Sequence, residues 1–141
     1  MDGEIDITSL KYILYARKST TDETRQVRSI PDQTKERLEL ADRLALTVVN
    51  RKRPIKETRS AKIPDRRPLF TQMVKDIKAG EYDAILAWHP DRLSRNMREG
   101  GEIIDLIDQG IIKDLKFCTH HFENTPSGKM LLGISFVLSK Q

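Results

Sequence analysis

The sequence predicts a single α/β domain built around a largely parallel sheet. Short apolar runs of strand length alternate with longer segments of helical period along the whole chain. The run at residues 84–88 (AILAW) is apolar at every position, as in a strand that is buried on both faces. A chain of 141 residues with 38% hydrophobic and 33% charged residues has the size and composition of one globular domain.

The first half of the chain predicts two strands, a helix and a loop. Residues 11–16 carry aromatic and β-branched side chains and stop at a polar segment, so we expect a buried strand there. A helix follows from Pro31, because proline suits a first helical turn and apolar residues recur at helical spacing: Leu38, Leu40, Ala41, Leu44 and Ala45. A short strand is expected at residues 47–49. Residues 51–66 have no apolar period and contain two prolines, which predicts a loop.

The middle of the chain predicts two further helices around the strand at 84–88. The first is expected to begin at Pro68 and to end at Gly80, and the second to run from near Met97 to Gly110. Trp88, at the end of the intervening strand, is expected in the core.

The last part of the chain predicts a strand at residues 115–118 and then a strongly apolar helix from about residue 127, capped by Ser127. This helix reaches the end of the chain without a stop signal. An apolar helix with nothing to cover it needs a partner. We therefore expect a truncated dimerisation helix in a piece of a longer protein.

The charge distribution and the cysteine content restrict the kinds of binding site and cellular location that this sequence allows. The net charge is only +4, but residues 51–67 carry eight basic residues against two acidic ones, which indicates a flexible basic loop. The single Cys118 excludes an intrachain disulfide and a cysteine-rich metal site. His120 and His121 are adjacent, which is poor geometry for joint metal ligation. No export signal or membrane-spanning stretch is present, so we expect a cytoplasmic protein with no bound metal.

Polar residues follow two of the expected strands, at residues 17–19 (RKS) and 91–95 (DRLSR). Ligands of open α/β sheets bind outside the carboxyl ends of the strands, so we expect these clusters to converge. A serine hydroxyl such as Ser19 among fixed guanidiniums, with no histidine base beside it, suits a phosphodiester transition state better than an acyl one. Arg92 and Arg95 would share a helical face and could hold two phosphate oxygens. The simpler alternatives are a capping hydroxyl and a solvated helix start.

With these residues in place, the chain resembles the serine recombinase family, which comprises resolvases, invertases and large serine integrases. Four ordered motifs carry the resemblance: YARKST at residues 15–20, SIPDQ at 29–33, RPLF at 67–70 and DRLSR at 91–95. The second motif and the long basic segment are more similar to the large integrase or transposon branch than to the short resolvases.

The resemblance implies a resolvase-like three-layer domain over residues 1–141, with the family's separate DNA-binding region absent from this chain. It implies that Ser19 attacks a DNA phosphodiester to form a 5′-phosphoserine intermediate, followed by strand exchange and religation, in integration, excision or inversion. It also implies double-stranded DNA as partner, a homodimer or homotetramer of the full-length protein, a bacterial, phage or mobile-element origin, and no metal or other cofactor.

Individual roles follow from the motifs. The resemblance implies that a set of arginines clamps the phosphate: Arg17, Arg67, Arg92 and Arg95. Gln33 and Asp91 would position the groups around it, while Lys18, Arg28 and Arg66 would contact the flanking DNA backbone. Two groups could help to deprotonate Ser19: the dense positive charge around it, or a carboxylate such as Asp91.

Two other function classes compete with this interpretation. One is a non-enzymatic α/β module that binds an anion or a partner protein. A receiver module needs carboxylates for Mg²⁺ at the end of the first strand, where this chain has residues 16–18 (ARK) instead. The other is a phosphate-ester hydrolase that uses Ser19, which would turn over small phosphoesters. Neither alternative explains all four motifs together.

Overall fold

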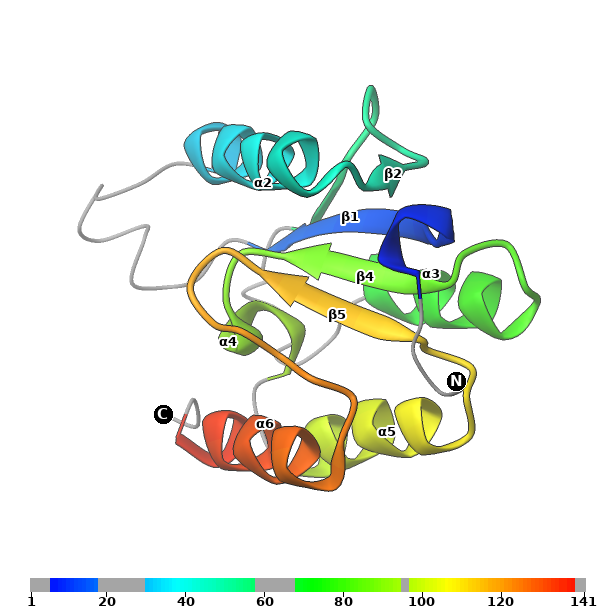
Figure 1. Ribbon diagram of the computed structural model, residues 1–141, viewed down its shortest axis with the longest axis vertical. Helices are drawn as coiled ribbons and strands as arrows, with labels where there is room; N and C mark the ends of the chain where they lie inside the picture. The colour runs from blue at the N-terminus through cyan, green and yellow to red at the C-terminus, as the bar shows by residue number, and fades with distance from the viewer. Residues whose placement is uncertain (1–5, 18–29, 58–67, 95–96, 139–141) are drawn as a thin grey trace.

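The computed structural model describes residues 6–17, 30–57, 68–94 and 97–138, which form a central sheet between helices (Figure 1). Within these ranges the side chains of residues 30–34, 91 and 97 are not described. The elements follow one another as η1 (Ile7–Ser9), β1 (Lys11–Arg17), α2 (Ile30–Leu44), β2 (Thr47–Val48), β3 (Ile55–Glu57), α3 (Pro68–Lys78), β4 (Ala84–Ala87), α4 (Pro90–Leu93), α5 (Met97–Asp108), β5 (Asp114–Phe117) and α6 (Pro126–Leu138).

The strands of the described sheet pair in parallel, in the order β2, β1, β4, β5, and β3 also pairs with β1. In the register across the centre, Tyr12 lies opposite Ala84, which lies opposite Asp114. Because the strands run in the same direction, their carboxyl ends meet at one edge of the sheet, on the left in Figure 1. The predicted α/β fold with a mainly parallel sheet is confirmed.

Helices cover both faces of the sheet and complete three layers. Alternate residues of β1 point to opposite faces, so Tyr12 and Leu14 belong to the cluster under α2, while Ile13 and Tyr15 belong to the larger cluster on the other side. Figure 1 shows α2 on one face, with α3, α4, α5 and α6 on the other. The continuous apolar run of β4 is buried along its whole length, as its sequence predicts.

The expected loop at residues 51–66 is wrong in one part, because Ile55–Glu57 form β3 in parallel to the end of β1. Three residues are too few to show an apolar alternation. The strand forms because its backbone pairs with residues 15–17 of β1. Between β2 and β3 the Asn50 side chain continues this pairing. Its Oδ1 accepts from the Leu14 N–H at 2.7 Å, and its Nδ2 donates to the Leu14 carbonyl oxygen at 2.9 Å.

The helix ends follow the predicted pattern with one exception. Gly80 and Gly110 follow α3 and α5 with φ of 88° and 77°, a left-handed conformation that favours glycine. At the start of α6, however, the cap is Thr125 and not Ser127, because the Gly128 N–H donates to Thr125 Oγ1 at 3.0 Å. Sequence preference alone does not distinguish two neighbouring hydroxyl residues.

Candidate active site

Arg17 and Arg92 meet at the carboxyl edge of the sheet. Arg17 is the last residue of β1, and Arg92 lies in α4, the single turn that follows β4. Since β1 and β4 are neighbours in the sheet, the two residues come together, and Arg17 Nε donates a hydrogen bond to the Arg92 carbonyl oxygen at 3.3 Å. Both are buried, with 7% and 5% of their surface exposed. The structure thus brings together one predicted site residue from each strand-end cluster.

Arg37 adds a third buried guanidinium, which the sequence analysis did not identify. It lies in α2 with no exposed surface. Burial lowers the pKa of Arg37 to about 10, the nearby Cys118 opposes this shift, the charge of Arg92 adds to it, and Glu36 opposes it. Arg37 stays protonated at neutral pH and adds positive potential behind the site. One signal was available: Arg37 precedes the apolar Ala41 by four residues and therefore shares its sheet-facing side of the helix.

Trp88 links α2 to the turn that carries Arg92. It was expected in the core, but it follows the last residue of β4 and is only half-buried. The Arg92 guanidinium carbon lies 5.2 Å from the centroid of the Trp88 ring, within cation–π range. The indole Nε1 donates a hydrogen bond to Glu36 Oε1 at 2.8 Å. The ring therefore contacts a candidate phosphate ligand on its face and α2 at its edge.

Glu57 is a second residue that the sequence analysis missed. Its buried carboxylate accepts hydrogen bonds from the backbone N–H groups of Leu69 and Phe70, at 2.9 and 3.0 Å, in the first turn of α3. It also accepts from the Tyr15 hydroxyl at 2.7 Å. A carboxylate at a helix N-terminus satisfies unpaired donors and complements the helix dipole. Glu57 thereby fixes the start of α3, which directly follows Arg67 in the sequence.

The other eight predicted site residues lie outside the described residues or have undescribed side chains. Gln33 lies in the first turn of α2, and Asp91 lies in α4 beside Arg92. The remaining six, which include the expected nucleophile, lie outside the described ranges: Lys18, Ser19, Arg28, Arg66, Arg67 and Arg95. In the sequence, Lys18 directly follows β1, Arg67 directly precedes α3, and Arg95 lies between α4 and α5.

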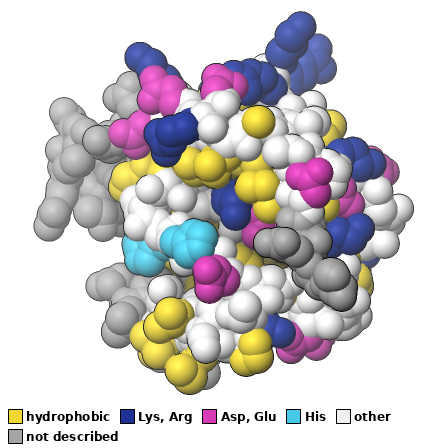
Figure 2. Space-filling model, viewed as in Figure 1, with side chains coloured by type: hydrophobic (Ala, Val, Ile, Leu, Met, Phe, Trp, Pro, Cys, Tyr) yellow, Lys and Arg dark blue, Asp and Glu magenta, His cyan; other side chains and the backbone are white. Residues whose placement is uncertain are grey.

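Two histidines pack against each other near this edge. His89 and His120 pack edge to face, with ring centroids 4.5 Å apart, and Figure 2 shows histidine side chains together on this face of the molecule. Within the described ranges, His, Cys, Asp and Glu nowhere gather in the groups of three or more that could hold a metal ion. Likewise, no helix in these ranges has the length and apolarity to cross a membrane.

The chemistry that this edge supports is the binding of an anion. Buried arginines cannot lose their charge as a lysine can, and a planar guanidinium offers paired donors to two oxygens of one phosphate. Such groups, held in place before the ligand arrives, stabilise negative charge that develops in a transition state. The described part of the site therefore fits a phosphodiester substrate.

The family model described as "Resolvase, N terminal domain" matches residues 12–140 of the chain.

Solved structures that are similar to this chain include an integrase catalytic domain and two recombinases. The N-terminal catalytic domain of TP901-1 integrase is 22% identical, with a TM-score of 0.66 over 88% of this chain and 89% of that one. A resolvase family site-specific recombinase from Streptococcus pneumoniae is 17% identical, with a TM-score of 0.67 over 89% and 85%. The C-terminal catalytic domain of ISC1926 TnpA, an IS607-like serine recombinase, is 18% identical, with a TM-score of 0.56 over 77% and 70%. These similarities show that the fold is shared.

Proposed function

The chain belongs to the resolvase family of serine recombinases, enzymes that cleave and rejoin DNA, and on this premise we propose that Ser19 is its nucleophile. The domain is the catalytic domain of a site-specific recombinase. One observation carries the assignment of the site: the buried junction of Arg17 and Arg92 at the carboxyl edge of the sheet. Ser19 follows Arg17 by two positions in the sequence.

In the proposed reaction, Ser19 Oγ attacks the phosphorus of a DNA phosphodiester. The new bond joins Oγ to phosphorus, the bond from phosphorus to O3′ breaks, and O3′ leaves with a proton as a free hydroxyl. The protein then carries a 5′-phosphoserine. Attack by the 3′ hydroxyl of an exchanged strand reverses these bond changes and restores Ser19. The proton of Ser19 is lost with the help of dense positive charge or of a carboxylate such as Asp91.

The arginines of the first, third and fourth motifs are proposed to bind the reacting phosphate: Arg17, Arg67, Arg92 and Arg95. Support for Arg67 comes from Glu57, which fixes the start of α3 immediately after it. Gln33 and Asp91 are proposed to orient the groups around the phosphate. The guanidiniums supply the charge stabilisation that metal ions give in other phosphoryl transfers, so the proposed reaction runs without metal or other cofactor.

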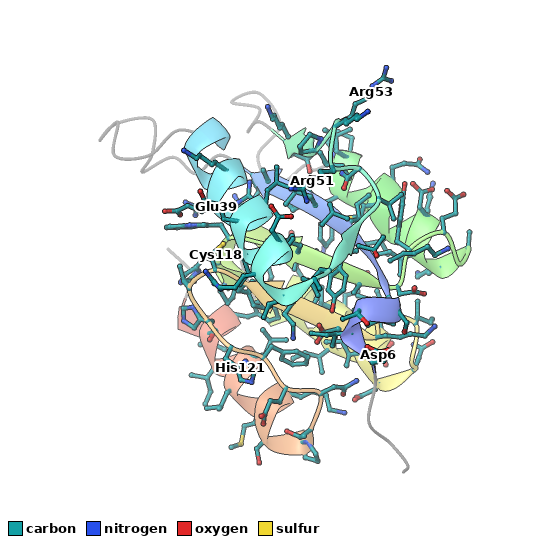
Figure 3. The ribbon with its side chains drawn as sticks, turned by 45° about the horizontal axis from the view of Figure 1, so that its top comes forward. Asp6, Glu39, Arg51, Arg53, Cys118 and His121 are labelled. Carbon is teal, nitrogen blue, oxygen red and sulfur yellow. The ribbon has the colours of Figure 1, made fainter. Side chains whose placement is uncertain are left out.

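Contacts to the DNA backbone outside the reacting phosphate are proposed for Lys18, Arg28 and Arg66. The described part of the basic segment is consistent with such contacts, because its cations are exposed: Arg51, Lys52, Arg53 and Lys56. Figure 3 shows Arg53 extending away from the body of the protein. Phosphate contacts of this kind strengthen binding without reading sequence. A domain that acts on DNA works in the cytoplasm or nucleoid.

Helix α6 is proposed to pair with a second copy of this chain in a homodimer, and two dimers to form a homotetramer on DNA. Leu132 and Phe136 are buried on one side of the helix, while the other side is exposed and apolar: Met130 (64%), Leu131 (61%), Ile134 (48%) and Val137 (43%). Hydrophobic side chains gather at the end of the molecule where α6 lies (Figure 2). Several large apolar side chains exposed on one helix favour an interaction surface.

The proposed nucleophile is tested by a covalent adduct. The protein at its full natural length and its Ser19→Ala variant are incubated with supercoiled DNA that carries the recombination site, in the presence of EDTA, and denatured before electrophoresis. We expect a DNA adduct with the unmodified protein and none with Ser19→Ala. An adduct formed by both proteins would assign the nucleophile to another residue, and turnover of small phosphoesters through Ser19 would favour a hydrolase.

A further inference from the structure

We propose that Trp88 and Glu36 are positioning residues for Arg92. In this arrangement the Glu36 carboxylate fixes the indole ring, and the face of the ring holds the Arg92 guanidinium for the DNA phosphate. The inference rests on the proposed function, because it takes Arg92 as a phosphate ligand.

Three contacts define the arrangement. The Glu36 carboxylate accepts from the Trp88 indole at 2.8 Å, the Arg92 guanidinium lies 5.2 Å from the centroid of the same ring, and the Arg92 backbone carbonyl accepts from Arg17. The hydrogen bond to Glu36 restricts the rotation of the Trp88 indole ring. The backbone and the side chain of Arg92 are thus each held by a different neighbour.

Electrostatics explain why Arg92 needs such support. It shares the buried edge of the sheet with Arg17, and the charge of Arg92 also acts on Arg37. Like charges close to one another raise the free energy of holding the Arg92 guanidinium at this edge. An aromatic face attracts a cation and leaves its charge available to the phosphate.

The hydrogen bond of Glu36 also joins two parts of the active site. Glu36 lies in α2 three residues after Gln33, so both positions fall on the same side of that helix. Trp88 directly follows β4 and directly precedes the turn that carries Arg92. One bond therefore ties the helix that carries Gln33 to the turn that carries Arg92.

Trp88 is the single tryptophan of the chain, so its fluorescence reports directly on this contact. The test compares Glu36→Leu, which removes the acceptor, with Glu36→Gln, whose amide oxygen can still accept from the indole. The matched control is Glu39→Leu, an equal change of charge at an exposed position of the same helix. Each protein is assayed for the rate of Ser19-dependent adduct formation, tryptophan emission and Tm.

We expect Glu36→Leu to slow adduct formation about tenfold and to shift the emission maximum. Glu36→Gln should remain within about twofold of the unmodified protein in rate, and Glu39→Leu should change neither the rate nor the emission. Trp88→Phe, which keeps a ring and loses the N–H, should slow the reaction similarly. Adding Glu36→Leu to Trp88→Phe should then cost no further rate, because both changes remove the same bond.

Full activity in Glu36→Leu, or equal losses in Glu36→Gln and Glu36→Leu, would overturn the positioning role while the proposed function stands. If Glu36→Leu does not fold, the comparison of Trp88→Phe with Glu36→Gln decides in its place: a wild-type rate in Trp88→Phe overturns the proposal. Absence of an adduct with the unmodified protein would instead remove the proposed function, and this inference with it.

Discussion

The Tyr12 hydroxyl donates a hydrogen bond of 2.5 Å to the Asp114 carboxylate across the width of β4. The residue between them in the register is Ala84, whose small side chain leaves room for the tyrosine ring to pass over the strand. Lys116 pairs with the same carboxylate at 3.1 Å. The hydrogen bond between Tyr12 and Asp114 thus links β1 to β5 across β4, on the face of the sheet that α2 covers.

The Tyr12 pair predicts a loss of stability in alkali. Burial raises the pKa of Tyr12, and the hydrogen bond and charge of Asp114 raise it further. In the unfolded chain the tyrosine releases its proton near the usual value of 10.0, while the folded protein retains it. The unfolded state then binds fewer protons, so the free energy of unfolding falls as pH rises above about 10.

Chemical denaturation between pH 7 and 11 tests this prediction. Tyr12→Phe should lose about 1–2 kcal/mol at pH 7, because the buried carboxylate loses a donor, and should show a shallower decline above pH 10. Tyr82→Phe is the comparison: burial also raises the pKa of the partly buried Tyr82, but less than that of Tyr12, so its removal should flatten the decline less. An unchanged alkaline slope in Tyr12→Phe would show that other groups cause the decline.

Glu57→Gln should weaken both the fold and the reaction. An amide has one acceptor oxygen where the carboxylate uses two, so one of the bonds to Tyr15 and to the first turn of α3 is lost. We expect a loss of about 1–3 kcal/mol in the free energy of unfolding and slower adduct formation, because Arg67 adjoins this turn. Tyr15→Phe removes only the hydroxyl bond and should affect stability alone. Equal activity of Glu57→Gln and the unmodified protein would show that the start of α3 does not influence the phosphate site.

Arg17→Lys should reduce adduct formation by about 10²-fold, because a lysine cannot reproduce the paired donors of a guanidinium at a phosphate. Arg43→Lys is the matched control, because Arg43 is exposed in the last turn of α2 and lies outside the basic segment. Rates are compared at saturating DNA to separate chemistry from binding. Equal rates in the two variants would place Arg17 outside the phosphate clamp.

Gly100 and Gly101 form a matched pair in α5. A Cβ on Gly100 would overlap the Phe136 ring of α6, whereas a Cβ on Gly101 would meet no atom within 4 Å. Gly100→Ala should therefore destabilise the protein by about 1–3 kcal/mol through overpacking. Gly101→Ala should stabilise it by about 0.5–1 kcal/mol through helix propensity. Thermal unfolding measures both, and equal shifts would contradict the observed packing of α6 on α5.

The exposed face of α6 predicts a concentration-dependent dimer. Leu131→Lys places a charge in the middle of the apolar patch without touching the buried Leu132 and Phe136. We expect the variant to be monomeric at concentrations where the unmodified protein is dimeric, with an unchanged circular dichroism spectrum. Sedimentation velocity over a hundredfold range of concentration distinguishes the two. Glu102→Lys, an exposed change on α5, is the control for added positive charge.

The elements that sequence predicted well are those with long or unambiguous patterns. The helices that begin near Pro31, Pro68 and Met97, and the continuous apolar strand at residues 84–87, lie where they were expected. The three-residue strand β3 was missed because its hydrogen-bond partners belong to β1, 40 positions earlier in the register. The cap of α6 was placed on the wrong hydroxyl because Thr125 and Ser127 have the same local preference.

By itself, the sequence determined the fold class, the family and the order of the motifs, since these follow from local periodicity and from residue types at set spacings. The tertiary structure alone decided which side chains meet. Glu36 and Glu57 look like ordinary surface charges in the sequence, and Arg37 shows only a spacing of four residues from Ala41. The packing of α2 and β3 against β1 and β4 makes all three neighbours of the arginine site. Contacts between segments distant in the chain depend on how the layers pack, which local propensity does not encode.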